Sequence, residues 1–259
     1  MSDPLSASGS PPCWICGDPA DSDEHKFKRS DMVTRYGTNW PPVQQPFVFR
    51  GDGRWIRIQG PNSGQNLYRD MLCKPCNNAR TKPFDLAYER FSTWVLANAA
   101  TLCDRTEIDF GEVFGDSYPE ETIQLLCYFV KSLGCRIVDA GAEPPSALRR
   151  ILTTPNIIDT TPFRVTFGIN DFWHRVDPSG HIVGKGELIR WPDSSAEAGF
   201  SWSETLGYLE IYHWYDVVWH PFPYGGDVMT GPLRSVRLAH YDPFPSEPAA
   251  TMAGVADSL

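Results

Sequence analysis

The chain has 259 residues, of which 41% are hydrophobic and 13% aromatic, so it is long and apolar enough to bury a sizeable core. It contains no run of eighteen apolar residues, which excludes an ordinary membrane-spanning helix. Its net charge of -9, taken as an average, argues against a polyanionic partner such as nucleic acid.

Both ends of the chain are predicted to lack fixed structure. Residues 1–12 are small, polar and proline-rich, and they have neither the basic nor the apolar part of a secretory signal. Residues 246–259 are expected to form a flexible tail. With no signal and no membrane span, the protein is expected to be cytoplasmic.

The N-terminal third alternates short β-rich and helical stretches. Weak helical character in residues 28–36 stops at Gly37. Residues 46–60 are typical of a β-hairpin with a Gly-Asp-Gly turn, and residues 67–73 form a third extended run. Apolar residues at helical spacing in residues 84–95 then predict a helix directly after the second cysteine pair.

The rest of the chain changes from helical to β patterns. Pro119 suits the first turn of a long helix, and residues 146–153 predict a second, short helix. After residue 160 the pattern is β-rich with Gly, Pro and Asp between the strands. The predicted strands lie in residues 163–169, 181–191, 200–203, 206–219 and 235–241.

Charge is distributed unevenly along the chain. From Glu24 to Arg90 there are twelve Lys or Arg and six Asp or Glu, a local balance of +6 that leaves -15 for the remainder. A nucleic-acid site on an otherwise acidic body would have this pattern. Uneven surface charge without function would give the same pattern.

Four of the seven cysteines form two C-x-x-C pairs that are 56 residues apart. This spacing is typical of metal ligands, and it predicts one structural zinc ion held by four thiolates. The alternative is that they are unpaired core cysteines. The zinc ligands are predicted to be Cys13, Cys16, Cys73 and Cys76, whereas Cys103, Cys127 and Cys135 have apolar neighbours and are expected in the core.

The stretch DSDEHKFKRSD, residues 21–31, places Glu24 directly before His25. A histidine in such a stretch is most often a surface residue on a solvated loop. If one zinc ion clamps both cysteine pairs, however, His25 and Asn77 are brought close together. A Glu beside a His, with an Asn amide opposite, can hold one divalent cation and orient one water for hydrolysis.

Together, the segments CWIC, EH and CKPCNN resemble the pattern of the zinc-containing HNH, or ββα-metal, nucleases. That pattern is a C-x-x-C pair, an acidic residue before His, a hairpin, and a second C-x-x-C pair followed by Asn or His on a helix. The resemblance covers residues 13 to 95, and residues 100–259 match no recognised pattern.

The resemblance implies a role for each matching residue. His25 would be the general base that takes a proton from the attacking water. Glu24 and Asn77 would hold a catalytic Mg²⁺ or Mn²⁺ ion, although Asp is commoner than Glu at the first position. Asn66 falls on the family's central asparagine, which steadies the histidine, but it lies seven residues before Cys73, further than the pattern leads us to expect. The zinc ion would stabilise the fold and would take no part in catalysis.

Six basic residues surround these positions in the sequence. They could contact phosphates without reading bases, or they could be ordinary solvated residues. The six are Lys26, Lys28, Arg29, Lys74, Arg80 and Lys82.

The C-terminal histidines have no acidic partner at a recognised ligand spacing, so they are expected to be ordinary packed or surface residues. They are His174, His181, His213, His220 and His240. The aromatic run in residues 212–226 could form a partner surface, but strands in a core carry the same residues, and we favour the core.

The sequence therefore predicts an α+β protein with an HNH-like module in residues 13–99 and an α+β region with a mainly antiparallel sheet in residues 100–245. The predicted reaction is metal-dependent cleavage of phosphodiester bonds, with DNA favoured over RNA. The C-terminal region could support homo-oligomers or bind a protein partner. One alternative is a catalytically silent zinc module that binds nucleic acid or protein, and another is a purely structural zinc domain.

Overall fold

The computed structural model describes residues 10–40, 47–49, 55–154, 162–176, 183–191, 199–216 and 226–242. Residues 1–9 of the N-terminal tail that was predicted over residues 1–12, the predicted hairpin turn and the C-terminal tail lie outside these ranges, as do His181 and His220. Pro12, at the end of the predicted tail, forms a β-bridge with Pro19. Among the described residues, no helix is both long and apolar enough to cross a membrane.

The N-terminal part contains two small two-stranded sheets. Strand β1 (Ser22–His25) pairs antiparallel with β4 (Leu67–Leu72), and β2 (Phe47–Phe49) pairs antiparallel with β3 (Trp55–Arg57). Helix α1 (Arg29–Tyr36) follows β1 and ends at Gly37, whose φ of 72° suits a residue without a Cβ. The pairing predicted within residues 46–60 is confirmed for residues 47–49 and 55–57, and the predicted helix end is confirmed.

Six further α-helices follow in the described part of the chain. They are α2 (Lys82–Ala97), α3 (Ala99–Leu102), α4 (Phe110–Phe114), α5 (Tyr118–Asp139), α6 (Ser146–Thr153) and α7 (Asp171–Val176). The helix predicted after the second cysteine pair is α2, and Pro119 lies in the first turn of α5 as expected. A short sheet pairs β5 (Glu107–Asp109) with β12 (Ser235–Arg237).

The C-terminal part forms a sheet of seven strands among the described residues, in the order β11-β6-β10-β9-β7, with β13 against β6 and β8 against β9. All pairs are antiparallel except β13 with β6. The strands are β6 (Phe163–Asn170), β7 (Val183–Lys185), β8 (Ile189–Trp191), β9 (Gly199–Leu206), β10 (Leu209–Tyr215), β11 (Val228–Met229) and β13 (Ala239–Tyr241). The predicted α+β class with a mainly antiparallel sheet is confirmed.

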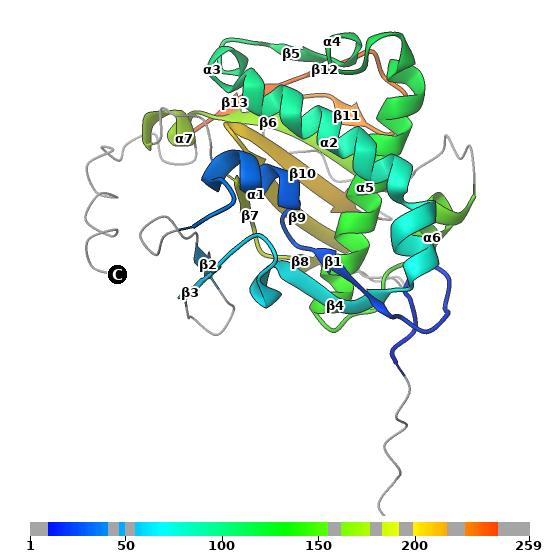
Figure 1. The fold of residues 1–259 in the computed structure, drawn as a ribbon. Coiled ribbons are helices and arrows are strands. Elements are labelled where there is room, and N and C mark those ends of the chain that lie inside the picture. The colour runs from blue at the N-terminus through cyan, green and yellow to red at the C-terminus, as the bar shows by residue number, and fades with distance from the viewer. Residues whose placement is uncertain are drawn as a thin grey trace, which may run out of the picture.

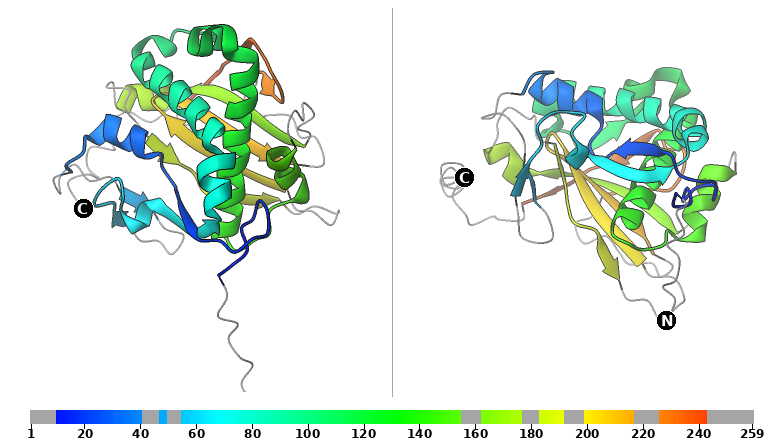
Figure 2. Two further views of the ribbon diagram at one scale, coloured as in Figure 1. Left: turned by 45° about the vertical axis from the view of Figure 1, so that its right-hand side comes forward. Right: turned by 60° about the horizontal axis from the view of Figure 1, so that its bottom comes forward.

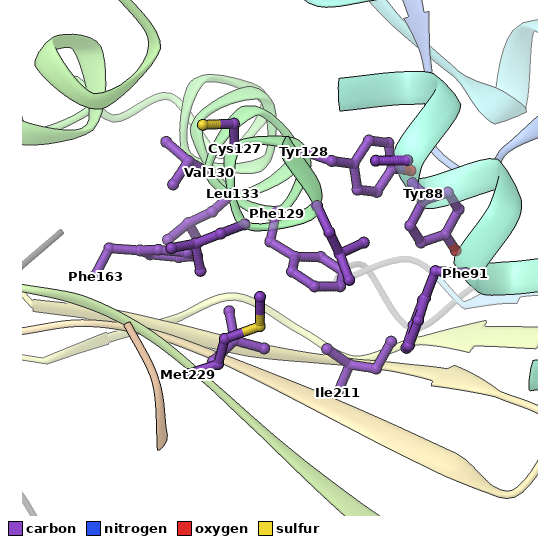
Figure 3. Packing of buried hydrophobic residues seen from close by; sticks show 14 of the residues in the cluster. Tyr88, Phe91, Cys127, Tyr128, Phe129, Val130, Leu133, Phe163, Ile211 and Met229 are labelled. Carbon is purple, nitrogen blue, oxygen red and sulfur yellow. The ribbon is translucent and has the colours of Figure 1, made fainter. Parts of the chain in front are cut away.

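Helices α2 and α5 lie side by side across one face of the large sheet (Figures 1 and 2). Phe91 of α2 and Phe129 of α5 point toward the sheet, where they face Ile211 and Met229, whereas Tyr88 and Tyr128 stack on each other between the two helices (Figure 3). Burying aromatic rings of this size is the main source of stability in such a core. The same buried cluster extends from Cys13 to Leu238, so it includes residues from both sides of position 100.

The first cysteine pair docks directly onto this helical layer through Trp14. The ring lies so close to Gly134 of α5 that a Cβ there would be 2.3 Å from Trp14 Cζ2. The indole Nε1 donates to Cys135 Sγ at 3.3 Å, and Arg149 of α6 donates to the Trp14 carbonyl at 2.9 Å. Both Cys127 and Cys135 are buried as predicted, and Cys103 is partly buried.

Candidate zinc centre and the Glu24–His25 site

The four paired cysteines meet at one point. The Sγ atoms of Cys13, Cys16, Cys73 and Cys76 all lie within 4.8 Å of one another. A zinc ion with Zn–S bonds near 2.3 Å places its ligands about 3.8 Å apart in a tetrahedron. Four thiols gathered at this spacing could hold a metal ion, and their chemistry fits zinc.

A backbone turn at each cysteine pair directs its two sulfurs toward the centre of the cluster. Gly17 donates its N–H to the Cys13 carbonyl at 2.8 Å and has a φ of 88°, which favours glycine. The second pair begins a π-helical turn, Pro75–Arg80, that runs into α2. Each pair therefore lies in a tight backbone turn, which we call a knuckle.

The environment of Cys13 favours a thiolate, whereas burial raises the pKa of its neighbour Cys16 to about 11. Burial opposes ionisation of Cys13, but N–H groups of Cys73, Cys16 and Ile15 donate to its sulfur and lower the thiol pKa below its usual value. Arg80 also donates to Cys76 Sγ at 3.3 Å. Such donors stabilise the charge that metal-bound thiolates carry.

Asn66 holds the chain immediately after His25. It is fully buried, and its Oδ1 accepts from the Phe27 N–H at 2.8 Å while Nδ2 donates to the carbonyls of Phe27 at 3.1 Å and Pro61 at 3.0 Å. Its own carbonyl accepts from the Lys26 N–H at 2.7 Å. The structure therefore places Asn66 where it braces the backbone that follows the histidine.

Asn77 ties the second knuckle to β1. Its Nδ2 donates to Ser22 Oγ and to the Asp23 carbonyl, both at 2.9 Å. The start of the helical segment is thus joined to the strand that ends with His25. No hydrogen bond within the described part of the chain reaches Asn77 Oδ1.

Glu24 and His25 leave β1 in different directions, because consecutive side chains in a strand point to opposite faces. Glu24 points toward α5, where its Oε2 lies 2.8 Å from Lys131 Nζ. No pattern in the sequence pointed to this partner. Burial alone would lower the pKa of Lys131, but the carboxylates of Glu24 and Asp85 raise it above its usual value, so the ammonium is charged.

The surroundings of the His25 imidazole favour its neutral form. Burial lowers its pKa below the usual value. The negative charge of Glu24 and a side-chain hydrogen bond with Asn62 oppose this shift, and the positive charges of Lys28 and Arg29 add to it. Its Nε2 atom is buried and has no hydrogen-bond partner among the described residues. A neutral ring with an unpaired nitrogen can accept a proton.

Three of the six predicted phosphate contacts are paired with acidic residues. Lys26 Nζ lies 2.9 Å from Asp139, Lys28 Nζ lies 2.6 Å from Asp85, and Lys74 Nζ lies 3.3 Å from Asp21. Lys28 is also largely buried, with 19% of its side chain exposed. Arg29, Arg80 and Lys82 are exposed and form no ion pair among the described residues, although Arg80 donates to Cys76 Sγ.

Two of the C-terminal histidines lie near acidic residues: His240 Nδ1 is 3.8 Å from Asp171 Oδ1, and His213 is paired with Glu204. His213 is fully buried, as a packed residue should be, but its Nε2 lies 3.0 Å from Glu204 Oε1. Lys185 also pairs with Glu204 at 3.1 Å, and despite burial these two partners lower the pKa of Glu204 to about 2. His213 is thus a packed residue, as expected, and its acidic partner was not visible in the sequence spacing because it lies on the neighbouring strand β9.

Comparison of the chain with known family models, with curated proteins and with solved structures finds no match.

Proposed function

We propose that the chain is a metal-dependent endonuclease whose N-terminal part is a zinc-clamped ββα-metal module, with DNA favoured over RNA as the substrate. The observation that carries this proposal is the brace of Asn66 on the backbone after His25, combined with an imidazole that burial keeps neutral. The four-cysteine cluster, β1, β4 and α2 occur in the order that such a module requires.

In this proposal each residue has a separate task. His25 accepts the proton of the attacking water at Nε2, and Asn66 fixes the position of the imidazole through the backbone. The divalent ion would be held by Glu24 and Asn77, whose Oε1 and Oδ1 atoms accept no hydrogen bond from the described residues. When bound, such an ion stabilises negative charge on the phosphate and the leaving oxygen.

A catalytically silent zinc module is the second candidate, and one observation favours it. Glu24, the proposed metal ligand, is already paired with the buried ammonium of Lys131. In this case the module would bind nucleic acid or protein without cleaving it.

Incubation of the purified protein with plasmid, single-stranded DNA and RNA, in Mg²⁺, Mn²⁺ or EDTA, separates the two candidates. The proposed function predicts cleavage that EDTA abolishes and that His25→Ala greatly reduces. His174→Ala is the matched control, because His174 is an exposed histidine on α7. Binding without cleavage in any metal would support the silent module.

A further inference from the structure

Four charged side chains form a compact network between β1, α1, α2 and α5. Lys131 Nζ lies 2.8 Å from Glu24 Oε2 and 3.1 and 3.2 Å from the two carboxylate oxygens of Asp85. Lys28 Nζ lies 2.6 Å from Asp85 Oδ1. Two ammonium groups and two carboxylates therefore cancel each other in charge.

Lys131 is the most buried member of this network, with 1% of its side chain exposed. A lysine is almost never buried this deeply unless carboxylates compensate for its loss of hydration. Its three short contacts to carboxylate oxygens surround the ammonium much as ligands surround a small cation. Lys131 thus acts as a cation that is tethered to the helix and held beside Glu24.

We propose that Lys131 sets the affinity of the Glu24 site for a divalent ion, keeping it low because its ammonium repels a second cation. This inference rests on the proposed function, in which Glu24 is a metal ligand. Repulsion between like charges a few ångströms apart is strong when both are shielded from water. Only 12% of the Glu24 side chain and 19% of the Asp85 side chain are exposed, so solvent screens this repulsion weakly.

The charge of Lys131 can be separated from its packing by two substitutions with opposite expected effects. Lys131→Gln keeps a polar donor near Glu24 but leaves the network with one excess negative charge. Asp85→Asn keeps Lys131 and leaves one excess positive charge. We expect Mn²⁺ binding to tighten roughly tenfold or more in the first variant and to weaken in the second. If Lys131 only supported the fold, both variants would bind Mn²⁺ more weakly.

Binding of Mn²⁺ to the zinc-loaded protein without nucleic acid, followed by the loss of the free-ion electron paramagnetic resonance signal, measures this affinity directly. Lys131→Arg keeps the charge, and its affinity should stay within about threefold of wild type. Adding Glu24→Gln to Lys131→Gln should remove the gained affinity. Zinc content and circular dichroism check that each variant is folded.

The proposal is overturned if folded Lys131→Gln binds Mn²⁺ no more tightly than wild type, or if Asp85→Asn binds it more tightly. If Lys131→Gln does not fold, Lys28→Gln decides, since it removes a positive charge from the partly exposed side of the network. Its Mn²⁺ affinity should rise, and an unchanged affinity would contradict the proposal. Because the assay contains no substrate, an absence of nuclease activity does not affect its outcome.

Discussion

The side-chain amide of Asn66 bonds to both backbone groups of Phe27, accepting from its N–H at 2.8 Å and donating to its carbonyl at 3.1 Å. This pairing resembles the hydrogen bonding of one more strand residue, and it is made by a fully buried side chain. It holds the chain two residues beyond His25, so the end of β1 cannot shift without breaking buried hydrogen bonds.

We therefore expect Asn66→Ala to be destabilising. The substitution leaves Phe27 and Pro61 backbone groups without partners, which should reduce the free energy of unfolding by about 2 to 4 kcal/mol. Gln65→Ala, at the exposed neighbouring position, should change it by less than about 0.5 kcal/mol. Urea unfolding of the wild type and both variants tests this. If Asn66→Ala is as stable as Gln65→Ala, the hydrogen bonds of the Asn66 side chain do not contribute to stability.

Zinc binding should depend on all four paired cysteines. One equivalent of zinc is expected to copurify with the protein, and Cys73→Ser should lose the metal and unfold the N-terminal part, since closed sites of this kind contribute on the order of 10 kcal/mol to folding. Cys103→Ser, which changes a cysteine outside the cluster, should keep the zinc. Elemental analysis measures the zinc content of the wild-type protein and of both variants. If the wild-type protein contains no zinc, the two cysteine pairs are not joined by this metal.

Gly134→Ala tests how tightly the first knuckle packs on α5. Alanine favours a helix over glycine by about 1 kcal/mol, but the new Cβ would lie 2.3 Å from the Trp14 ring, and relieving such a clash costs typically about 1 to 3 kcal/mol or more. A net loss of stability is expected in thermal unfolding. Gly60→Ala meets no atom within 4 Å and should be nearly neutral. A stabilised Gly134→Ala protein would mean that the ring moves aside freely.

Asp31 should make stability depend on pH. Burial raises its pKa to about 6, although Ser92 and Tyr88 donate hydrogen bonds to it. In the unfolded chain the pKa returns to about 3.9, so between these values the folded protein holds a proton that the unfolded chain has released. Stability should therefore fall as pH rises from about 4 to about 6, by roughly 2 to 3 kcal/mol.

Comparison with Asp31→Asn isolates this effect from other titrating groups. The unfolding free energy of wild type minus that of the variant should decrease over this pH range and stay constant above it. A difference that does not change with pH would show that Asp31 ionises in the folded protein as it does in the unfolded chain.

Features that depend on nearby residues were predictable from the sequence. Gly37 ends α1 because a positive φ is needed there, and the C-x-x-C spacing identifies the four sulfurs that meet. Partners that depend on tertiary packing were not predictable. Lys131 lies more than a hundred residues from Glu24, and the sequence of its helix indicates only an apolar face packed on the sheet.

The sequence contained a weak indication that His213 and Glu204 would pair. The two residues lie on β10 and β9, which form a tight antiparallel pair, and they are near-diagonal neighbours on the inner face of the sheet. Assigning the register of these strands would have brought them together.

Three of the basic residues were expected at phosphates and lie instead in ion pairs, because acidic residues from distant segments reach them in the fold.

The central claim is that His25 is the general base of a phosphodiester hydrolase, and the rate of plasmid cleavage in Mg²⁺ by wild type, His25→Ala and His174→Ala tests it most directly. Loss of a positioned general base typically slows a reaction roughly 10²- to 10⁴-fold. We expect His25→Ala to keep its zinc, bind DNA and cut at least a hundredfold more slowly, while His174→Ala cuts at the wild-type rate. Wild-type cleavage that His25→Ala retains in full would place the catalytic site elsewhere, and a wild-type protein that cuts no nucleic acid would contradict the claim altogether.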